Sequence, residues 1–191
     1  MSTDPDNDDV DDDLANKSDA ELQTELLRRM KRAGDSARVR HDQVFQLDMD
    51  NLSAAPDDPL LQIGYALVPQ LPGHWDDVLL DLTSAADDVR TMAMVRMQEE
   101  GDEPPDNRIH FFSDLTEPAL ALRRSTYEPN GRGAWYTAMI RLARDGTITA
   151  KFEFDLPPFG LWGPNEVALV SRDQELYPRD PARLPRWHPA R

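Results

Sequence analysis

The chain has 191 residues, of which 39% are hydrophobic and none is cysteine, and its formal net charge is −15. This length predicts one domain with a sizeable core plus appendages, and the lack of cysteine excludes disulfides and thiolate metal sites. No run of residues has the pattern of a signal peptide or a membrane span, so we expect a soluble cytoplasmic protein.

The negative charge is distributed unevenly along the chain. Net charges are −7 for residues 1–20, zero for 21–55, −10 for 56–106 and +2 for 107–191. A field of this sign repels nucleic acid and membrane surfaces, and it attracts basic proteins. Acidic residues also promote solubility. Charge by itself therefore leaves two interpretations open, a solubilising surface and a surface for a basic protein partner.

The first 56 residues are predicted to lie outside the compact domain. Residues 1–17 have almost no apolar side chain, which predicts a disordered acidic tail. A helix and a linker are expected over 18–56, the helix opening with a capping box from Ser18 to Glu21. The apolar stripe of this helix is Leu22, Leu26, Leu27 and Met30, and its basic end is Arg28, Arg29, Lys31 and Arg32. The basic end is either a surface for an anionic group, including the acidic tail, or a solvated face.

The compact domain is expected over residues 57–191. Its predicted elements are a helix over 60–71, strands over 74–84, 88–98 and 108–112, a helix within 113–131, and strands over 136–142 and 148–154. The capping residue of the second helix is expected among Ser113, Asp114 and Thr116. Met92 and Met94 lie on the face opposite to the main apolar residues of their strand, which indicates partial cover of that face too.

Residues 135–158 carry the clearest pattern, two alternating strands joined by Asp145 and Gly146. A two-residue loop would place apolar side chains opposite polar ones, whereas a three-residue loop over 144–146 pairs Leu142 with Ile148. We therefore predict the three-residue loop, with Gly146 in the left-handed backbone region. The predicted apolar face consists of Tyr136, Ile140, Leu142, Ile148, Phe152 and Phe154.

After Pro158 the sequence becomes irregular, with one short helix predicted around Glu175. Strands joined by short links favour an antiparallel arrangement. The predicted fold is α+β, an antiparallel sheet of about five strands with helices packed mainly on one face. Trp75 and Trp135 stand just before strands and are expected at the edge of the core. The later tryptophans, Trp162 and Trp187, are either core residues or interface anchors.

The sequence shows no pattern of residues with obvious chemistry. The histidines lack the spacing of a metal site and are His41, His74, His110 and His188. The acidic pairs at 76–77 and 87–88 lie at strand ends and turns, where we expect them to be ionised and not to share a proton. We therefore expect no catalytic residue, no metal and no cofactor. An enzyme with a dispersed active site is a minor alternative.

Several motifs occur in an order that resembles a known family. A helix ending in Leu-Pro-Gly precedes a strand that opens with a tryptophan. A second helix is followed by a tryptophan, the hairpin with Asp-Gly at its turn, Phe-x-x-Asp, Tyr-Pro-Arg and a last tryptophan. The residues are Trp75, Trp135, Asp145, Gly146, Phe152, Asp155, Tyr177, Pro178, Arg179 and Trp187. Over roughly residues 57–188 the chain resembles the YezG-like immunity proteins of bacterial polymorphic toxin systems.

The resemblance implies a small cytoplasmic inhibitor that binds the toxin domain of a secreted effector, often a nuclease. Nuclease toxins tend to be basic around the substrate groove, so an acidic inhibitor can steer toward it. A secretion chaperone, which would bind a targeting segment of an effector, is the alternative. The acids we select for toxin contact are expected around one sheet edge and are Asp87, Asp88, Glu99, Glu100, Asp102 and Glu103.

Overall fold

The computed structural model describes residues 24, 43–53, 56–98, 107–159 and 163–191. The described strands are β1 (Gln43–Gln46), β2 (Trp75–Ala85), β3 (Asp88–Met97), β4 (Asn107–His110), β5 (Thr137–Ala143) and β6 (Thr147–Glu153). The described α-helices are α2 (Pro59–Leu67), α3 (Thr116–Ser125) and α4 (Pro164–Leu176), with short 3₁₀ helices at Val68–Gln70 and Pro181–Arg183. The predicted tail, and the predicted first helix apart from the helical Thr24, lie outside the described residues.

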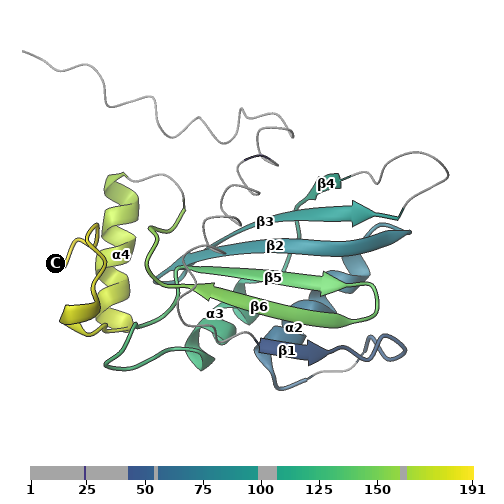
Figure 1. Cartoon of the computed structure of the whole chain (residues 1–191), viewed down its shortest axis with the longest axis horizontal. Coiled ribbons are helices and arrows are strands. Elements are labelled where there is room, and N and C mark those ends of the chain that lie inside the picture. Colours follow the sequence, from purple (N-terminus) through teal and green to yellow (C-terminus); the bar gives the residue numbers. More distant parts are fainter. Residues whose placement is uncertain (1–23, 25–42, 54–55, 99–106, 160–162) are drawn as a thin grey trace, which may run out of the picture.

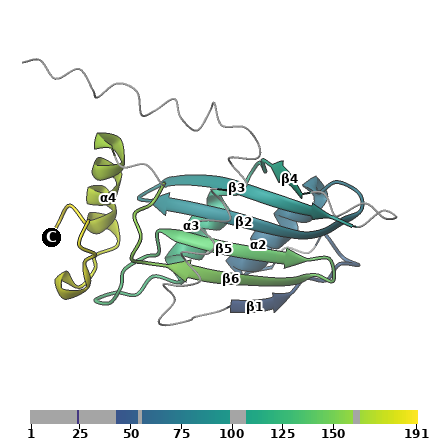
Figure 2. The same ribbon diagram turned by 45° about the horizontal axis from the view of Figure 1, so that its top comes forward.

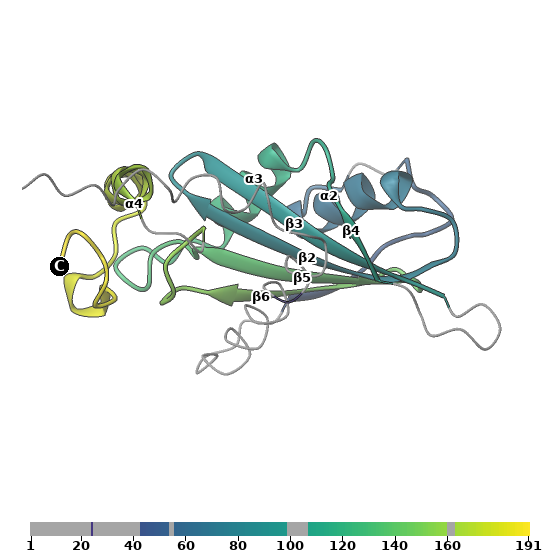
Figure 3. The same ribbon diagram turned by 90° about the horizontal axis from the view of Figure 1, so that it is seen from above.

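The strands form one antiparallel sheet in the order β1-β6-β5-β2-β3-β4 (Figure 1). The predicted α+β class is confirmed, with six strands in place of about five. Helices α2 and α3 pack on one face of the sheet (Figure 3). The main core lies between these layers and includes Leu60, Ile63, Leu67, Leu80, Leu122, Ile140, Leu142 and Ile148. Trp75 and Trp135 are buried in the same core, as predicted.

The β5–β6 hairpin has the register that the sequence predicts. Leu142 lies opposite Ile148, and Ile140 lies opposite Ala150. Gly146 has a φ of +88°, and a Cβ at this position would come within 2.9 Å of the carbonyl oxygen of Leu47. The turn therefore requires glycine for two reasons, its left-handed backbone and the close approach of a neighbouring chain segment.

Strand β1 is absent from our sequence-based prediction. It pairs with β6 at the edge of the sheet, and Leu47, the residue that follows it, is buried in the main core. The sheet thus begins before Asp57, where we expected the compact domain to start. Four residues, Gln-Val-Phe-Gln, are too few for an alternating pattern to be distinguished from a linker.

Helix α3 begins without the side-chain cap that we predicted. Its N-cap residue is Leu115, and no side chain caps the helix. The hydroxyl of Ser113 instead donates to Gln70 over 3.1 Å or to Asp114 over 3.0 Å. Leu115 is 2% exposed, so packing of this side chain determines where the helix starts.

Helix α4 stands at the end of the sheet, near the β2–β3 turn (Figure 2). It has 13 residues and begins at Pro164, so it is longer than the short helix predicted around Glu175. The carboxylate of Glu166 accepts a hydrogen bond from the backbone N–H of Gly163 over 3.2 Å, which closes the first turn. Helix α4 encloses a second, smaller core of Ala85, Tyr136, Phe159 and Val170, with Trp187 packed against it.

Candidate protein-binding surfaces

The second face of the sheet carries none of the helices α2, α3 and α4 (Figure 3). Strand register gives this face an apolar band of Leu79, Met92, Met94 and Met139, with Asp81 in its middle and Arg141 and Lys151 at one side. Strand register places Met92 beside Asp81, Asp81 beside Met139, and Met139 beside Lys151. The adjacent row is Ile109, Met94, Leu79, Arg141 and Thr149. Met94 is only 7% exposed. From Met92 and Met94 we predicted partial cover of this face, and the burial of Met94 agrees with that prediction.

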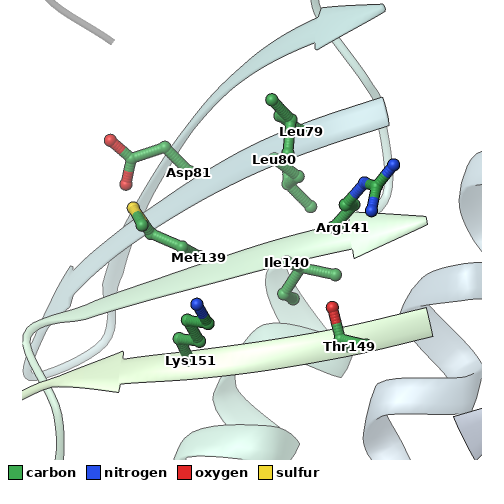
Figure 4. Close-up of a pocket in the computed structure, with 8 residues that line it drawn as sticks. All are labelled: Leu79, Leu80, Asp81, Met139, Ile140, Arg141, Thr149 and Lys151. Atoms are coloured by element: carbon green, nitrogen blue, oxygen red, sulfur yellow. The ribbon is translucent and has the colours of Figure 1, made fainter. Parts of the chain in front are cut away.

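Between β2, β5 and β6 the second face is hollowed (Figure 4). The hollow has a volume of about 290 Å³ and is lined mainly by Leu79, Asp81, Met139, Arg141, Thr149 and Lys151. Charged groups of both signs therefore border an apolar floor. Such a hollow suits an apolar side chain of a protein partner framed by polar contacts. Its mixed charge gives no preference for a basic partner.

A buried carboxylate fixes two arginines beside the hollow. Asp77 is 5% exposed and accepts hydrogen bonds from Arg96 and, over 2.9 Å, from Arg141. Arg96 also donates through Nε to Asp76 over 3.0 Å. These bonds link β3, β2 and β5 across the second face. The two arginine side chains keep 41% and 54% of their surface exposed, so they remain accessible to a partner.

Carboxylates gather at the end of the sheet that holds the β5–β6 turn, which we call the turn end. They belong to Asp48, Asp50, Asp76 and Asp145. Backbone hydrogen bonds of 2.9 Å join the segments that carry them, from Leu47 N to the oxygen of Gly146 and from Arg144 N to the oxygen of Asp76. The connection after β1, the first residues of β2 and the β5–β6 turn therefore bring their acids to one end of the sheet.

The turn end is net negative and also contains basic groups. Arg144 donates to the carbonyl oxygen of Trp75 over 2.9 Å, and Arg96 lies 2.8 Å from the carboxylate of Asp76. Hydrogen bonds from Thr147 lower the pKa of Asp145, which keeps this exposed carboxylate ionised at neutral pH. Among these acids, Asp145 stands in the predicted hairpin turn and Asp76 lies within the strand predicted over 74–84. Asp48 and Asp50 follow β1, which the sequence did not predict.

Of the six acids selected from the sequence, the structure describes two, Asp87 and Asp88. Asp87 and Asp88 lie at the β2–β3 turn, where Asp87 pairs with Arg172 over 2.9 Å and Asp88 with Arg90 over 3.4 Å. Strand β3 has 10 residues, roughly 30 Å at the usual rise per residue. The segment 99–106 follows the other end of this strand. Glu99, Glu100, Asp102 and Glu103 lie outside the described residues.

A buried ion pair joins α3, α4 and the end of β2. Arg123 and Asp173 are both 0% exposed, and the guanidinium donates to the two carboxylate oxygens over 2.6 Å and 2.9 Å. Asp173 also accepts from the backbone N–H of Ala86 over 2.7 Å, and Arg123 donates to the carbonyl oxygen of Trp135 over 2.9 Å. We did not predict this pair. Its signal is an arginine on the buried stripe of α3, beside Leu122.

Next to this pair lies a second polar cluster built on the C-terminal segment. Arg179 is 3% exposed, donates to the carbonyl oxygen of Phe154 over 3.0 Å, and stacks 4.1 Å from the ring centre of Tyr136. Burial raises the pKa of Tyr136 to about 12. Burial, followed by the charge of Arg179, lowers the pKa of His188. These groups hold the C-terminal segment to the sheet, and Trp187 adds a 2.6 Å bond from Nε1 to the oxygen of Asp155.

Within the described part of the chain, no group of three or more potential ligand side chains is placed to hold a metal ion. No helix among the described residues has the length and apolar character needed to cross a membrane. Comparisons of the chain with protein-family models, with curated proteins and with solved structures found no match. The resemblance to YezG-like immunity proteins rests on the sequence motifs.

Proposed function

We propose that this protein is an immunity protein that binds a basic toxin domain and blocks it by occlusion, without chemistry of its own. The observation that carries the proposal is the turn end, where carboxylates from three separate parts of the chain share one end of the sheet. Asp145 is bound to the hairpin backbone by a 2.9 Å bond from Thr147 N, and Asp48 accepts from Asp50 N over 3.1 Å. These acids are therefore fixed before a partner arrives, which reduces the ordering cost of association.

The charge balance of the chain supports electrostatic steering toward a basic partner. The described residues include nineteen acidic and fourteen basic side chains, a net charge of −5, whereas the whole chain has −15. The segment 99–106 has five acids and no base. The described residues that flank this segment lie at the turn end, because Met97 pairs with Trp75 and Asn107 pairs with Arg96. Acids near one end of a molecule raise the association rate with a basic surface.

The first experiment identifies the partner. Candidate toxin domains are expressed in bacteria with and without the full chain, and rescue of growth is scored. The proposal predicts that the full chain rescues growth from one of these toxin domains and binds that domain alone. Binding only to a targeting segment of the effector would instead support a secretion chaperone. Turnover of a small molecule by the purified protein would contradict the proposal.

The second experiment tests the surface. The variant with Asp50→Lys and Asp76→Lys is compared with a control of equal net charge, Glu117→Lys and Glu175→Lys, in which exposed acids of α3 and α4 are reversed. At low salt the turn-end variant should associate with the toxin domain about tenfold more slowly than the control, and the difference should shrink at high salt. Equal association rates in the two variants would exclude the turn end as the contact surface.

A further inference from the structure

The apolar band of the second sheet face has the burial of a covered surface. Asp81, in the middle of the band, is 2% exposed and Met94 is 7% exposed, although helices α2 and α3 lie on the other face and α4 at the end of the sheet. Leu79, Met92 and Met139 continue the band and are half-buried. Methionine side chains adapt to an irregular partner surface, so the band has the composition of a docking site.

The chain itself contains a segment that matches this band. Residues 18–33 have the sequence pattern of an amphipathic helix, with Leu22, Leu26 and Met30 on one stripe. The stripe from Leu22 to Met30 extends about 12 Å along a helix, and the band crosses β3, β2, β5 and β6, about 14 Å at the usual strand spacing. The stripe and the band therefore have similar lengths, and both combine apolar side chains with charged groups.

We infer that the predicted helix over 18–33 docks on the apolar band of the second sheet face. The chain geometry allows it. The link 34–42 has nine residues and reaches about 30 Å when extended. Strand β1, where the link ends at Gln43, is separated from β2 by β6 and β5, a distance of about 14 Å at the usual strand spacing.

Charge complementarity favours this segment over an unrelated occupant. The basic end of the predicted helix carries four basic residues between 28 and 32, and the band contains the buried carboxylate of Asp81. The acids of the first helical turns, Asp19 and Glu21, suit the opposite side of the hollow, where Lys151 is exposed. Docking uses a different surface from the turn end, so it goes beyond the proposed function and can fail separately from it.

The test uses a single thiol in the full chain, because the sequence has no cysteine. The Met139→Cys variant places this thiol in the band, and its rate of reaction with a maleimide measures exposure. Adding Leu26→Asp should accelerate labelling about tenfold, the change that about 1.4 kcal/mol produces, because aspartate is costly to bury against methionine and leucine. Met30→Asp, one turn further along the helix, should act in the same way.

The matched control is Thr24→Asp. Thr24 is exposed and helical, and it lies about 200° around the helix from Leu22, so labelling should change by less than about twofold. A thiol introduced by Arg186→Cys, at an exposed position of the C-terminal segment, should react at the same rate with and without each substitution in the helix. Equal labelling rates in the Met139→Cys chain that carries Leu26→Asp and in the one that carries Thr24→Asp would overturn the inference. Protection that increases with protein concentration would also overturn it, since a second copy would then cover the band.

Discussion

Arg123 has no exposed surface, and its guanidinium is held by the carboxylate of Asp173 and by a backbone carbonyl. Removing one member of a buried pair leaves the other charge without compensation. Arg123→Met should therefore lower the free energy of unfolding by roughly 3 to 5 kcal/mol. Arg124→Met, at the exposed neighbouring position, should change it by less than about 0.5 kcal/mol. Denaturant titration measures both, and similar losses in the two variants would contradict the assignment.

We expect His188 to make the stability of the folded chain depend on pH. It is 3% exposed, near Arg179, and both burial and that positive charge lower its pKa from the ordinary value of 6.5. The unfolded state then binds a proton at a higher pH than the folded state, so stability is lost as the pH falls below about 6.5. The negative charge of Asp173 raises the pKa of His188, so it only reduces the downward shift.

We therefore expect His188→Gln to reduce the loss of stability between pH 7 and pH 5, with the free energy of unfolding followed by denaturant titration at each pH. His74→Gln is the control, because His74 is exposed in the connection before β2. A pH dependence that is the same for His188→Gln and the unaltered chain would show that His188 does not contribute.

At the scale of elements, Gly146 in the β5–β6 turn can be compared with Gly73 in the connection before β2. Gly146 has a φ of +88° and a Cβ there would lie 2.9 Å from the oxygen of Leu47, whereas a Cβ on Gly73 would meet nothing within 4 Å. Gly146→Ala should lower the free energy of unfolding by about 1 to 3 kcal/mol, and Gly73→Ala by less than about 0.5 kcal/mol. Equal effects in thermal or denaturant unfolding would show that the turn tolerates a side chain.

Elements with a long alternating or helical pattern are the ones that sequence analysis predicted well. The hairpin register followed from pairing apolar with apolar residues, and Leu142 does lie opposite Ile148. Strand β1 was missed because four residues carry too little pattern, and the N-cap of α3 was wrong because burial of Leu115 outweighs capping. The Arg123–Asp173 pair joins residues 50 positions apart, so its geometry depends on tertiary packing that no local pattern contains.

At the scale of the whole molecule, the two candidate surfaces differ in charge. The hollow of the second face is bordered by Asp81, Arg141 and Lys151, whereas the turn end carries an excess of carboxylates. Of the six acids selected from the sequence, Asp87 and Asp88 belong to neither surface, since they pair with arginines at the β2–β3 turn. Sequence analysis could locate the acids along the chain. Only the sheet topology shows which strand ends they share.

The most direct test of the central claim is backbone amide hydrogen exchange of the full chain, alone and bound to the toxin domain that it neutralises. The account predicts added protection in the segments 47–51, 75–77 and 143–147, which form the turn end, and no change in α4 or at the β2–β3 turn. Protection confined to α4 and the β2–β3 turn, or spread over the second sheet face alone, would contradict it.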